Sequence, residues 1–94
     1  MDFRSIGHQG LRRLIVGNDS RGINPGLVSR LRRILTALVL AQNVENIVGP
    51  PGWRIHQLKG DRTGTWSVSV SGNWRLTFRM LDGDIIDLDL EDYH

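Results

Sequence analysis

Several histidine and arginine side chains in this sequence are suited to acid-base chemistry on a phosphate. His56 lies in a polar stretch three residues before Lys59, and the sequence ends on Asp92-Tyr93-His94. A histidine exchanges protons near neutral pH, and an arginine such as Arg75 holds phosphate oxygens through a planar fork of donors. Such groups can take the proton from a ribose 2'-hydroxyl, protonate the leaving 5'-oxygen and stabilise the phosphate. The required 2'-hydroxyl would make RNA the substrate and exclude DNA.

These residues also have a purely structural interpretation. Arg75 and Arg79 could form cross-strand ion pairs with aspartates of the last predicted strand, each worth at most about 1 kcal/mol. We favour this interpretation for Arg79, and for Arg75 both remain open. Lys59 could be a solvated charge at a strand end, and residues 91–94 could be a frayed polar tail.

Other kinds of catalytic site find no support in the sequence. His8, His56 and His94 lie far apart and form neither an HxH nor an HExxH spacing. There is no cysteine to bind zinc or act as a nucleophile, and no glycine-rich phosphate loop. We therefore expect no metal and no cofactor.

Length and composition predict one domain spanning residues 1–94, in the cytoplasm. A chain of 94 residues is the size of a single domain, and without cysteine its fold must rest on packing. The longest apolar run, residues 34–41, is too short to cross a bilayer, and the first residues do not form a signal peptide. Residues 1–62 carry ten Lys/Arg against four Asp/Glu, whereas residues 63–94 carry two against six. The basic first part could face phosphates or be an ordinary solvated surface.

Two helices are predicted in the first half of the chain. Apolar residues recur at helical spacing over residues 11–15 until Gly17-Asn18 ends the pattern. Asn24-Pro25 supplies an N-cap and a first-turn proline for a longer helix. This helix must end before or at Gly49-Pro50-Pro51. The apolar face of this helix consists of Leu27, Leu31, Ile34, Leu35, Leu38 and Val39. Three arginines point away from that face, namely Arg30, Arg32 and Arg33. They could be a solubilising surface or a contact with RNA or the ribosome.

After Pro51 the pattern changes to a period of two, which predicts four strands over residues 53–58, 65–71, 74–80 and 85–90. One face of the strands is apolar: Trp66, Val68, Val70, Trp74, Leu76, Phe78, Met80, Ile86, Leu88 and Leu90. We expect the opposite face to be wet and to carry His56, Arg75 and Tyr93. The predicted fold class is α+β, a twisted antiparallel β-sheet with two N-terminal helices packed on one face. Residues 2–6 could add an edge strand.

The turn between the last two strands sets their register. A three-residue loop Leu81-Asp82-Gly83, with Gly83 left-handed, would pair Phe78 with Ile86, whereas a two-residue turn would pair it with Asp87. We expect the three-residue loop, because it places two apolar residues opposite each other. The same reasoning at residues 71–73 pairs Trp66 with Phe78.

Three blocks of sequence occur in order: IHQLKGDRTGTWS at residues 55–67, NWRLTF at residues 73–78, and Asp92-Tyr93-His94. Together with Gly10-Leu11 in the first predicted helix, they closely resemble the HigB toxins of the RelE superfamily of bacterial toxin-antitoxin systems. The sequence departs from this pattern at Gln57, where relatives often have proline, so the strand geometry around His56 is expected to differ slightly.

The resemblance implies an mRNA endoribonuclease that acts in the ribosomal A site without a metal, on a RelE-like, microbial-ribonuclease-like fold. Position by position, His56 and Asp92-Tyr93-His94 match the catalytic group, and Arg75 and Lys59 match residues that bind the substrate phosphate. The implied partners are a HigA-like antitoxin with a helix-turn-helix, the 70S ribosome and mRNA, and the antitoxin complex is also expected to bind operator DNA. Strict alternation sends Asp92 and His94 to the core face, so this site requires the chain to leave the sheet after Leu90.

Two rival functions remain open. The first is a non-catalytic inhibitory binding protein of the same superfold, as in the ParE relatives, although a pure binder has no need of the proton donors at His56 and residues 92–94. The second is an RNA-binding accessory protein, which the arginine-rich first part favours but the missing aromatic RNP pattern does not.

Overall fold

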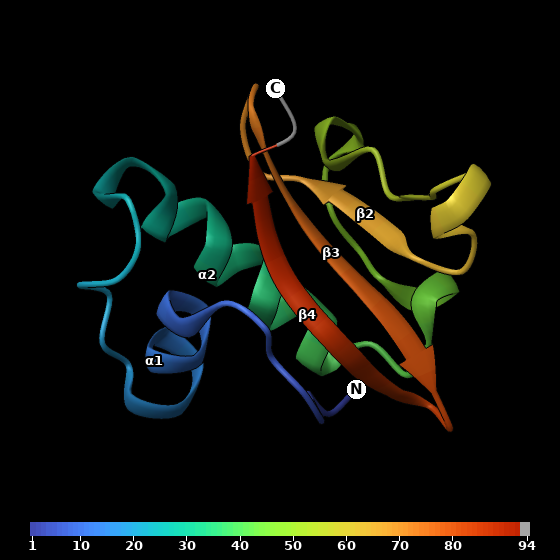
Figure 1. The fold of residues 1–94 in the computed structure, drawn as a ribbon, viewed down its shortest axis with the longest axis horizontal. Helices are drawn as coiled ribbons and strands as arrows, with labels where there is room; N and C mark the ends of the chain where they lie inside the picture. The colour runs from blue at the N-terminus through green and yellow to red at the C-terminus, as the bar shows by residue number, and fades with distance from the viewer. Residues whose placement is uncertain (93–94) are drawn as a thin grey trace.

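The computed structural model describes residues 1–92 and contains two helices followed by a four-stranded sheet (Figure 1). The helices are α1 (Gln9–Gly17) and α2 (Pro25–Leu40). The strands are β1 (His56–Gln57), β2 (Trp66–Ser69), β3 (Trp74–Leu81) and β4 (Asp84–Asp92). Three short 3-10 helices lie in the connections: η1 (Val44–Asn46), η2 (Pro51–Trp53) and η3 (Gly60–Arg62). Each strand pairs antiparallel with the next in the order β1-β2-β3-β4, which confirms the predicted α+β class.

Local sequence sets the helix ends. The Leu11 backbone N–H donates to His8 Nδ1 at the start of α1, and Asn18 ends this helix in the left-handed conformation with φ 52°. The Asn24 side chain accepts a hydrogen bond from the Gly26 N–H at 2.9 Å at the start of α2, with proline in its first turn. Both helix starts therefore satisfy backbone donors that would otherwise be unpaired. None of the helices in residues 1–92 is long and apolar enough to cross a membrane.

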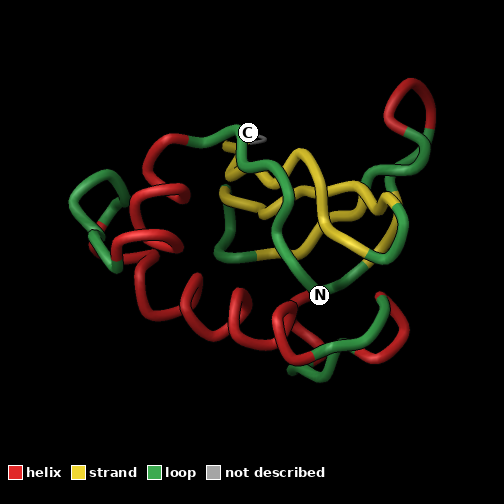
Figure 2. The backbone as a smooth tube through the Cα atoms, turned by 90° about the horizontal axis from the view of Figure 1, so that it is seen from below, coloured by secondary structure: helices red, strands yellow, loops and turns green. Residues whose placement is uncertain are grey.

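The helices cover one face of the sheet, and the core lies between these two layers (Figure 2). The connection between α1 and α2 packs tightly, because a Cβ added to Gly10 would lie 2.3 Å from the carbonyl oxygen of Gly22. Large apolar side chains with almost no exposed surface come from both layers: Leu11, Leu31, Ile34, Leu38, Val68, Leu76, Phe78, Ile85 and Leu88.

The β3–β4 hairpin corrects the predicted register. Leu81 pairs with Asp84, so the turn has two residues, Asp82 with φ 52° and Gly83 with φ 82°. A two-residue turn with both residues left-handed matches the twist of the flanking strands. The three-residue loop and the pairing of Phe78 with Ile86 were therefore wrong, whereas the left-handed Gly83 and the pairing of Trp66 with Phe78 are confirmed.

A β-bulge in β4 preserves the apolar face despite the shorter turn. Arg79 pairs with Ile86 but Thr77 pairs with Asp89, so β4 holds one more residue than β3 between these pairs. Asp87, with φ 53°, accommodates the extra residue. The bulge reverses the alternation, and Ile85 rather than Ile86 is fully buried together with Leu88.

The N-terminal segment lies along the outer edge of β4, but residues 2–6 form isolated bridges there and not the edge strand that the sequence suggested. It forms two isolated parallel bridges, one of which joins Phe3 to Ile85. The Ser5 hydroxyl oxygen accepts a hydrogen bond of 2.8 Å from the backbone N–H of Asp87. This contact satisfies a donor that the bulge removes from the strand ladder.

Strand β1 is much shorter than predicted. Pro51–Trp53 forms η2, and Arg54 follows it in the left-handed region with φ 48°. Only His56 and Gln57 then pair with β2.

Candidate active site

Two rows of cross-strand neighbours share the sheet face opposite the helices. The first row is His56, Ser67, Thr77 and Asp89, and the second is Ser69, Arg75 and Glu91. Neighbours across strands share a face, as do residues two apart along one strand. Because strands lie about 5 Å apart, the backbones of His56 and Thr77 are roughly 10 Å apart. The long side chains of His56 and Arg75 can therefore approach the same ligand on this face.

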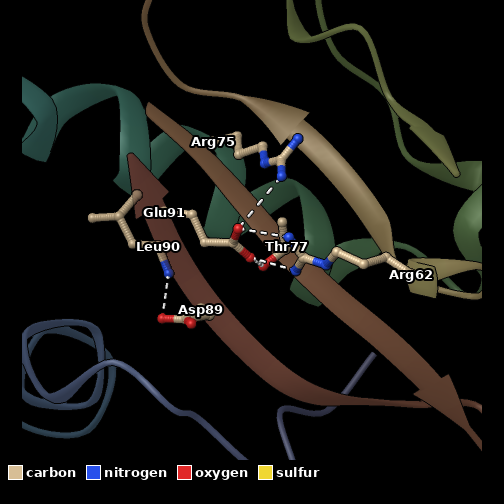
Figure 3. Close-up of polar contacts among 6 residues, drawn as sticks. All are labelled: Arg62, Arg75, Thr77, Asp89, Leu90 and Glu91. Atoms are coloured by element: carbon tan, nitrogen blue, oxygen red, sulfur yellow. Dashed lines mark hydrogen bonds and ion pairs between the residues drawn. The ribbon is translucent and has the colours of Figure 1, made fainter. Parts of the chain in front are cut away.

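Glu91 joins two arginines and a threonine on this face (Figure 3). Arg62, from η3, donates to both carboxylate oxygens at 2.8 and 2.6 Å. Arg75 Nη2 lies 3.5 Å from Glu91 Oε1, and the Thr77 hydroxyl donates a short hydrogen bond to Oε2. Glu91 thus connects the β1–β2 connection to β3 and holds Arg75 from one side.

This environment lowers the pKa of Glu91 from 4.5 to about 2. The hydrogen bonds from Arg62 are the largest cause, and the Thr77 hydroxyl and the charge of Arg75 act in the same direction. Partial burial opposes them. The same pairing raises the pKa of Arg62. Glu91 is therefore an ionised hydrogen-bond acceptor at neutral pH, and it has no proton to give to a substrate.

The polar face is less wet than predicted. Ser67 and Thr77 are each only 2% exposed, although their side chains lie on the face away from the helices. Arg62 and Glu91 bond across this part of the sheet, which accounts for a buried polar centre there. A buried hydroxyl is tolerated where it finds a partner, as Thr77 does in Glu91.

His56 is exposed, and one side of its ring is held in place. Its Nδ1 lies 2.7 Å from the backbone carbonyl oxygen of Arg54. A carbonyl can only accept, so Nδ1 carries the proton in this hydrogen bond. In the neutral ring Nε2 then has the free lone pair, which is the arrangement a general base requires. Arg54 thereby fixes the tautomer of His56.

The two arginines of β3 differ in their surroundings. The Arg75 side chain is 19% exposed and forms an ion pair with Glu91. Arg79 is exposed, and among residues 1–92 it forms no ion pair, so the expected cross-strand pair of Arg79 is absent from the part of the chain that the structure describes.

The remaining predicted residues with described positions are Lys59 and Asp92. Lys59 is exposed at the start of η3, in the connection that also carries Arg62. Strand β4 continues through Asp92, which pairs with Trp74, so the prediction that the chain leaves the sheet after Leu90 was wrong for Asp92. Tyr93 and His94 lie outside the described residues.

The sequence prediction missed Glu91 and Arg62. Counting alternately from the buried Leu90 places Glu91 on the polar face, but the sequence does not show that it lies beside Arg75. Arg62 lies in a 3-10 helix, and no local pattern indicates where its side chain points. Within residues 1–92, no three His, Asp or Glu side chains are grouped so that they could hold a metal ion.

Comparison with known proteins settles the family. Residues 4–94 match the family of HigB-like toxins, described as RelE-like toxins of type II toxin-antitoxin systems. The chain belongs to this family. The Endoribonuclease HigB of Proteus vulgaris is 36% identical over 92 residues, which cover 98% of this chain and 99% of that protein. The resemblance inferred from the three sequence blocks is thereby confirmed.

Solved structures confirm the fold of this HigB-like toxin. YafQ from E. coli superposes with a TM-score of 0.62 at 16% identity, covering 97% of this chain and 91% of YafQ. The same TM-score is found for the E. coli DinJ-YafQ toxin-antitoxin complex, at 16% identity and with 98% and 91% coverage. At 16% identity this similarity shows a shared arrangement of helices and strands and does not by itself show a shared function.

Proposed function

We propose that this HigB-like toxin is an endoribonuclease that cuts mRNA in the ribosomal A site by acid-base chemistry of its side chains. The observation that carries the proposal is the shared sheet face of Arg75 and His56, with the tautomer of His56 fixed by the Arg54 carbonyl. The near end-to-end similarity to the Proteus vulgaris endoribonuclease supports the RNA-cleaving part of the proposal.

The proposed reaction is an internal transfer of the phosphate. A general base removes the proton of the ribose 2'-hydroxyl, and the 2'-oxygen attacks phosphorus. The bond from phosphorus to the 5'-oxygen breaks, and a general acid gives the leaving oxygen its proton. The products are a 2',3'-cyclic phosphate and a free 5'-hydroxyl.

His56 Nε2 is suited to either proton transfer, because it is exposed and its partner nitrogen is already protonated. Tyr93 and His94 are proposed to complete the acid-base group, whereas Asp92 pairs with Trp74 in β4, shares the face of Leu90 and is left out of it. Arg75 would hold the phosphate and stabilise the charge that develops on it, and Lys59 would add a second cation. Glu91 and Arg62 would fix the position of Arg75 from the side away from the substrate.

The proposed partners follow from the family and the reaction. The toxin would be neutralised by a HigA-like antitoxin with a helix-turn-helix, in a complex that also binds operator DNA. The DinJ-YafQ complex supports an antitoxin partner in general terms. The ribosome and mRNA would be met in the cytoplasm.

The deciding experiment is in vitro translation of a defined message, with the 5' ends of the products mapped. We expect cuts at codons of the translated region, and none in the same message without ribosomes. Replacing the 2'-hydroxyl at the cut position by hydrogen should prevent cleavage there. Inhibition of growth without any new 5' ends would refute the nuclease proposal in favour of an inhibitory binding protein.

A further inference from the structure

The three outward arginines of α2 separate into two groups in the structure. Arg32 points toward α1 and bonds to the side-chain oxygen of Asn18. Arg30 and Arg33 are three residues apart on the helix, and both line a cleft of about 670 Å³ between α2, η2 and the end of β2. We call this hollow the arginine cleft. Its volume is within the range of sites that enclose a small ligand.

The lining of the arginine cleft combines donors for an anion with small and apolar residues and the partly buried Trp53. Arg54 is the third arginine, Ser69 and Ser71 supply hydroxyl groups, and Trp53 supplies an indole. No acidic residue lines the cleft, and none of the ion pairs in residues 1–92 uses Arg30, Arg33 or Arg54. Three exposed positive charges are thus held together without a carboxylate to neutralise them.

The backbone around Arg54 supports a functional interpretation. Arg54 has φ 48°, a left-handed conformation that costs a non-glycine residue of this kind free energy. Strained positions of this type concentrate at binding and catalytic sites. Here the conformation belongs to a residue whose carbonyl accepts the His56 hydrogen bond and whose side chain lines the cleft.

The arginine cleft adjoins the candidate active site, although neither His56 nor Arg75 lines it. Ser69 lines the cleft, and it is also the β2 partner of Arg75. Arg54 forms a second connection through His56. An RNA strand whose scissile phosphate lies at Arg75 must extend beyond it, and this cleft offers a cationic surface beside the site.

We propose that the arginine cleft binds the sugar-phosphate backbone of the RNA strand next to the cleaved bond. This inference rests on the proposed function, because it assumes that the RNA strand passes over Arg75. Arginine forks suit phosphate oxygens, and the serine hydroxyls can donate to the same groups.

The test measures binding of a short single-stranded RNA at several salt concentrations. Arg30→Ala/Arg33→Ala should weaken binding on the order of 10-fold or more at low salt. Because each phosphate contact on a single strand contributes about 0.7 to the slope of log K against log salt, the slope should fall by about 1.4. The matched control is Arg12→Ala/Arg13→Ala, which removes two exposed arginines of α1 outside the cleft. The control variant should leave the RNA affinity and the salt slope almost unchanged. Both double variants should have the melting temperature of the wild type.

Several results would overturn the inference. Equal loss in the two double variants would mean that only net charge matters. No measurable RNA binding by the wild type at low salt would remove the basis for the cleft. Competition by polyglutamate as effective as that by RNA of the same charge would instead indicate an acidic protein partner. Translation-dependent cleavage by the wild type tests the proposed function separately. If the wild type cuts mRNA but Arg30→Ala/Arg33→Ala binds RNA as tightly as the control variant does, RNA binding by the arginine cleft is refuted and the proposed function stands.

Discussion

Replacing Glu91 by glutamine should change how the stability of the fold depends on pH. The folded-state pKa of Glu91 is about 2, against an ordinary value of 4.5. A carboxyl group with a lowered pKa stabilises the fold above its unfolded-state pKa, and this contribution disappears as the pH falls through the folded-state value. The wild type should therefore lose the Glu91 contribution between about pH 4.5 and pH 2. Glu91→Gln keeps the shape of the side chain but cannot ionise, so its stability should lack this part of the pH dependence.

The size of the effect follows from the pKa difference and the exposure of the partners. The difference between 4.5 and about 2 is about 2.5, which corresponds to at most about 3.4 kcal/mol. The Glu91 side chain is 22% exposed and that of Arg62 is 43% exposed, so solvent screens part of the interaction. We expect a loss of about 1 to 2 kcal/mol in Glu91→Gln at pH 7.

The assay is urea unfolding of both proteins at pH 7, 4.5, 3 and 2, with the difference in unfolding free energy plotted against pH. The difference should be largest at pH 7 and shrink toward pH 2. Asp19→Asn is the matched control, because the pKa of Asp19 is also lowered to about 2, by hydrogen bonds from Arg21. The Asp19 pair lies on the surface, so its variant should differ far less from the wild type. A Glu91→Gln curve parallel to that of the wild type, or an equal loss in Asp19→Asn, would contradict the anchoring role of Glu91.

Three further predictions concern the site and the strand that carries it. Arg75→Ala should lower the rate of mRNA cleavage on the order of 100-fold, as for loss of a group that stabilises developing charge, whereas Arg79→Ala should do far less; equal losses would mean that Arg75 has no special role. Asp87→Val should destabilise the fold by about 1 to 2 kcal/mol in chemical unfolding, because a β-branched residue is strained at positive φ, and Asp87→Gly should not; equal stability of the two would disprove the strain argument. Removing His94 should reduce cleavage on the order of 100-fold with a melting temperature like that of the wild type, and full activity after truncation would exclude His94 from the acid-base group.

Much of the fold could be predicted because it depends on local pattern. The caps at Asn18 and Asn24 are recognisable from residue type, and the alternation after Pro51 indicates the strands. The register of the last hairpin could not be obtained in this way. It depends on a bulge at Asp87 whose backbone N–H bonds to Ser5, more than 80 residues away in sequence. Contacts of this range leave no local signal.

The candidate site could likewise be predicted only where it depends on local pattern. Alternation is sufficient to place His56 and Arg75 on one face, and this prediction agrees with the register of the sheet. The partner of Arg75 was not predicted, because the choice among the acidic residues of β4 depends on the register. Arg62 reaches Glu91 from a 3-10 helix, and its contribution required the three-dimensional structure.

The bulge at Asp87 explains both the wrong hairpin register and the missed partner of Arg75, because it decides which β4 residue faces Arg75. If the pairing of Arg79 with Ile86 continued without interruption, Arg75 would lie opposite Leu90, and Thr77 would lie opposite Leu88. Two core leucines would then be on the polar face. The extra residue moves the register by one, so that Leu90 pairs with Leu76 and Glu91 pairs with Arg75. One left-handed residue thus keeps the apolar side chains in the core and supplies the carboxylate that orients the proposed phosphate-binding arginine, as is typical of bulges that lie beside functional sites.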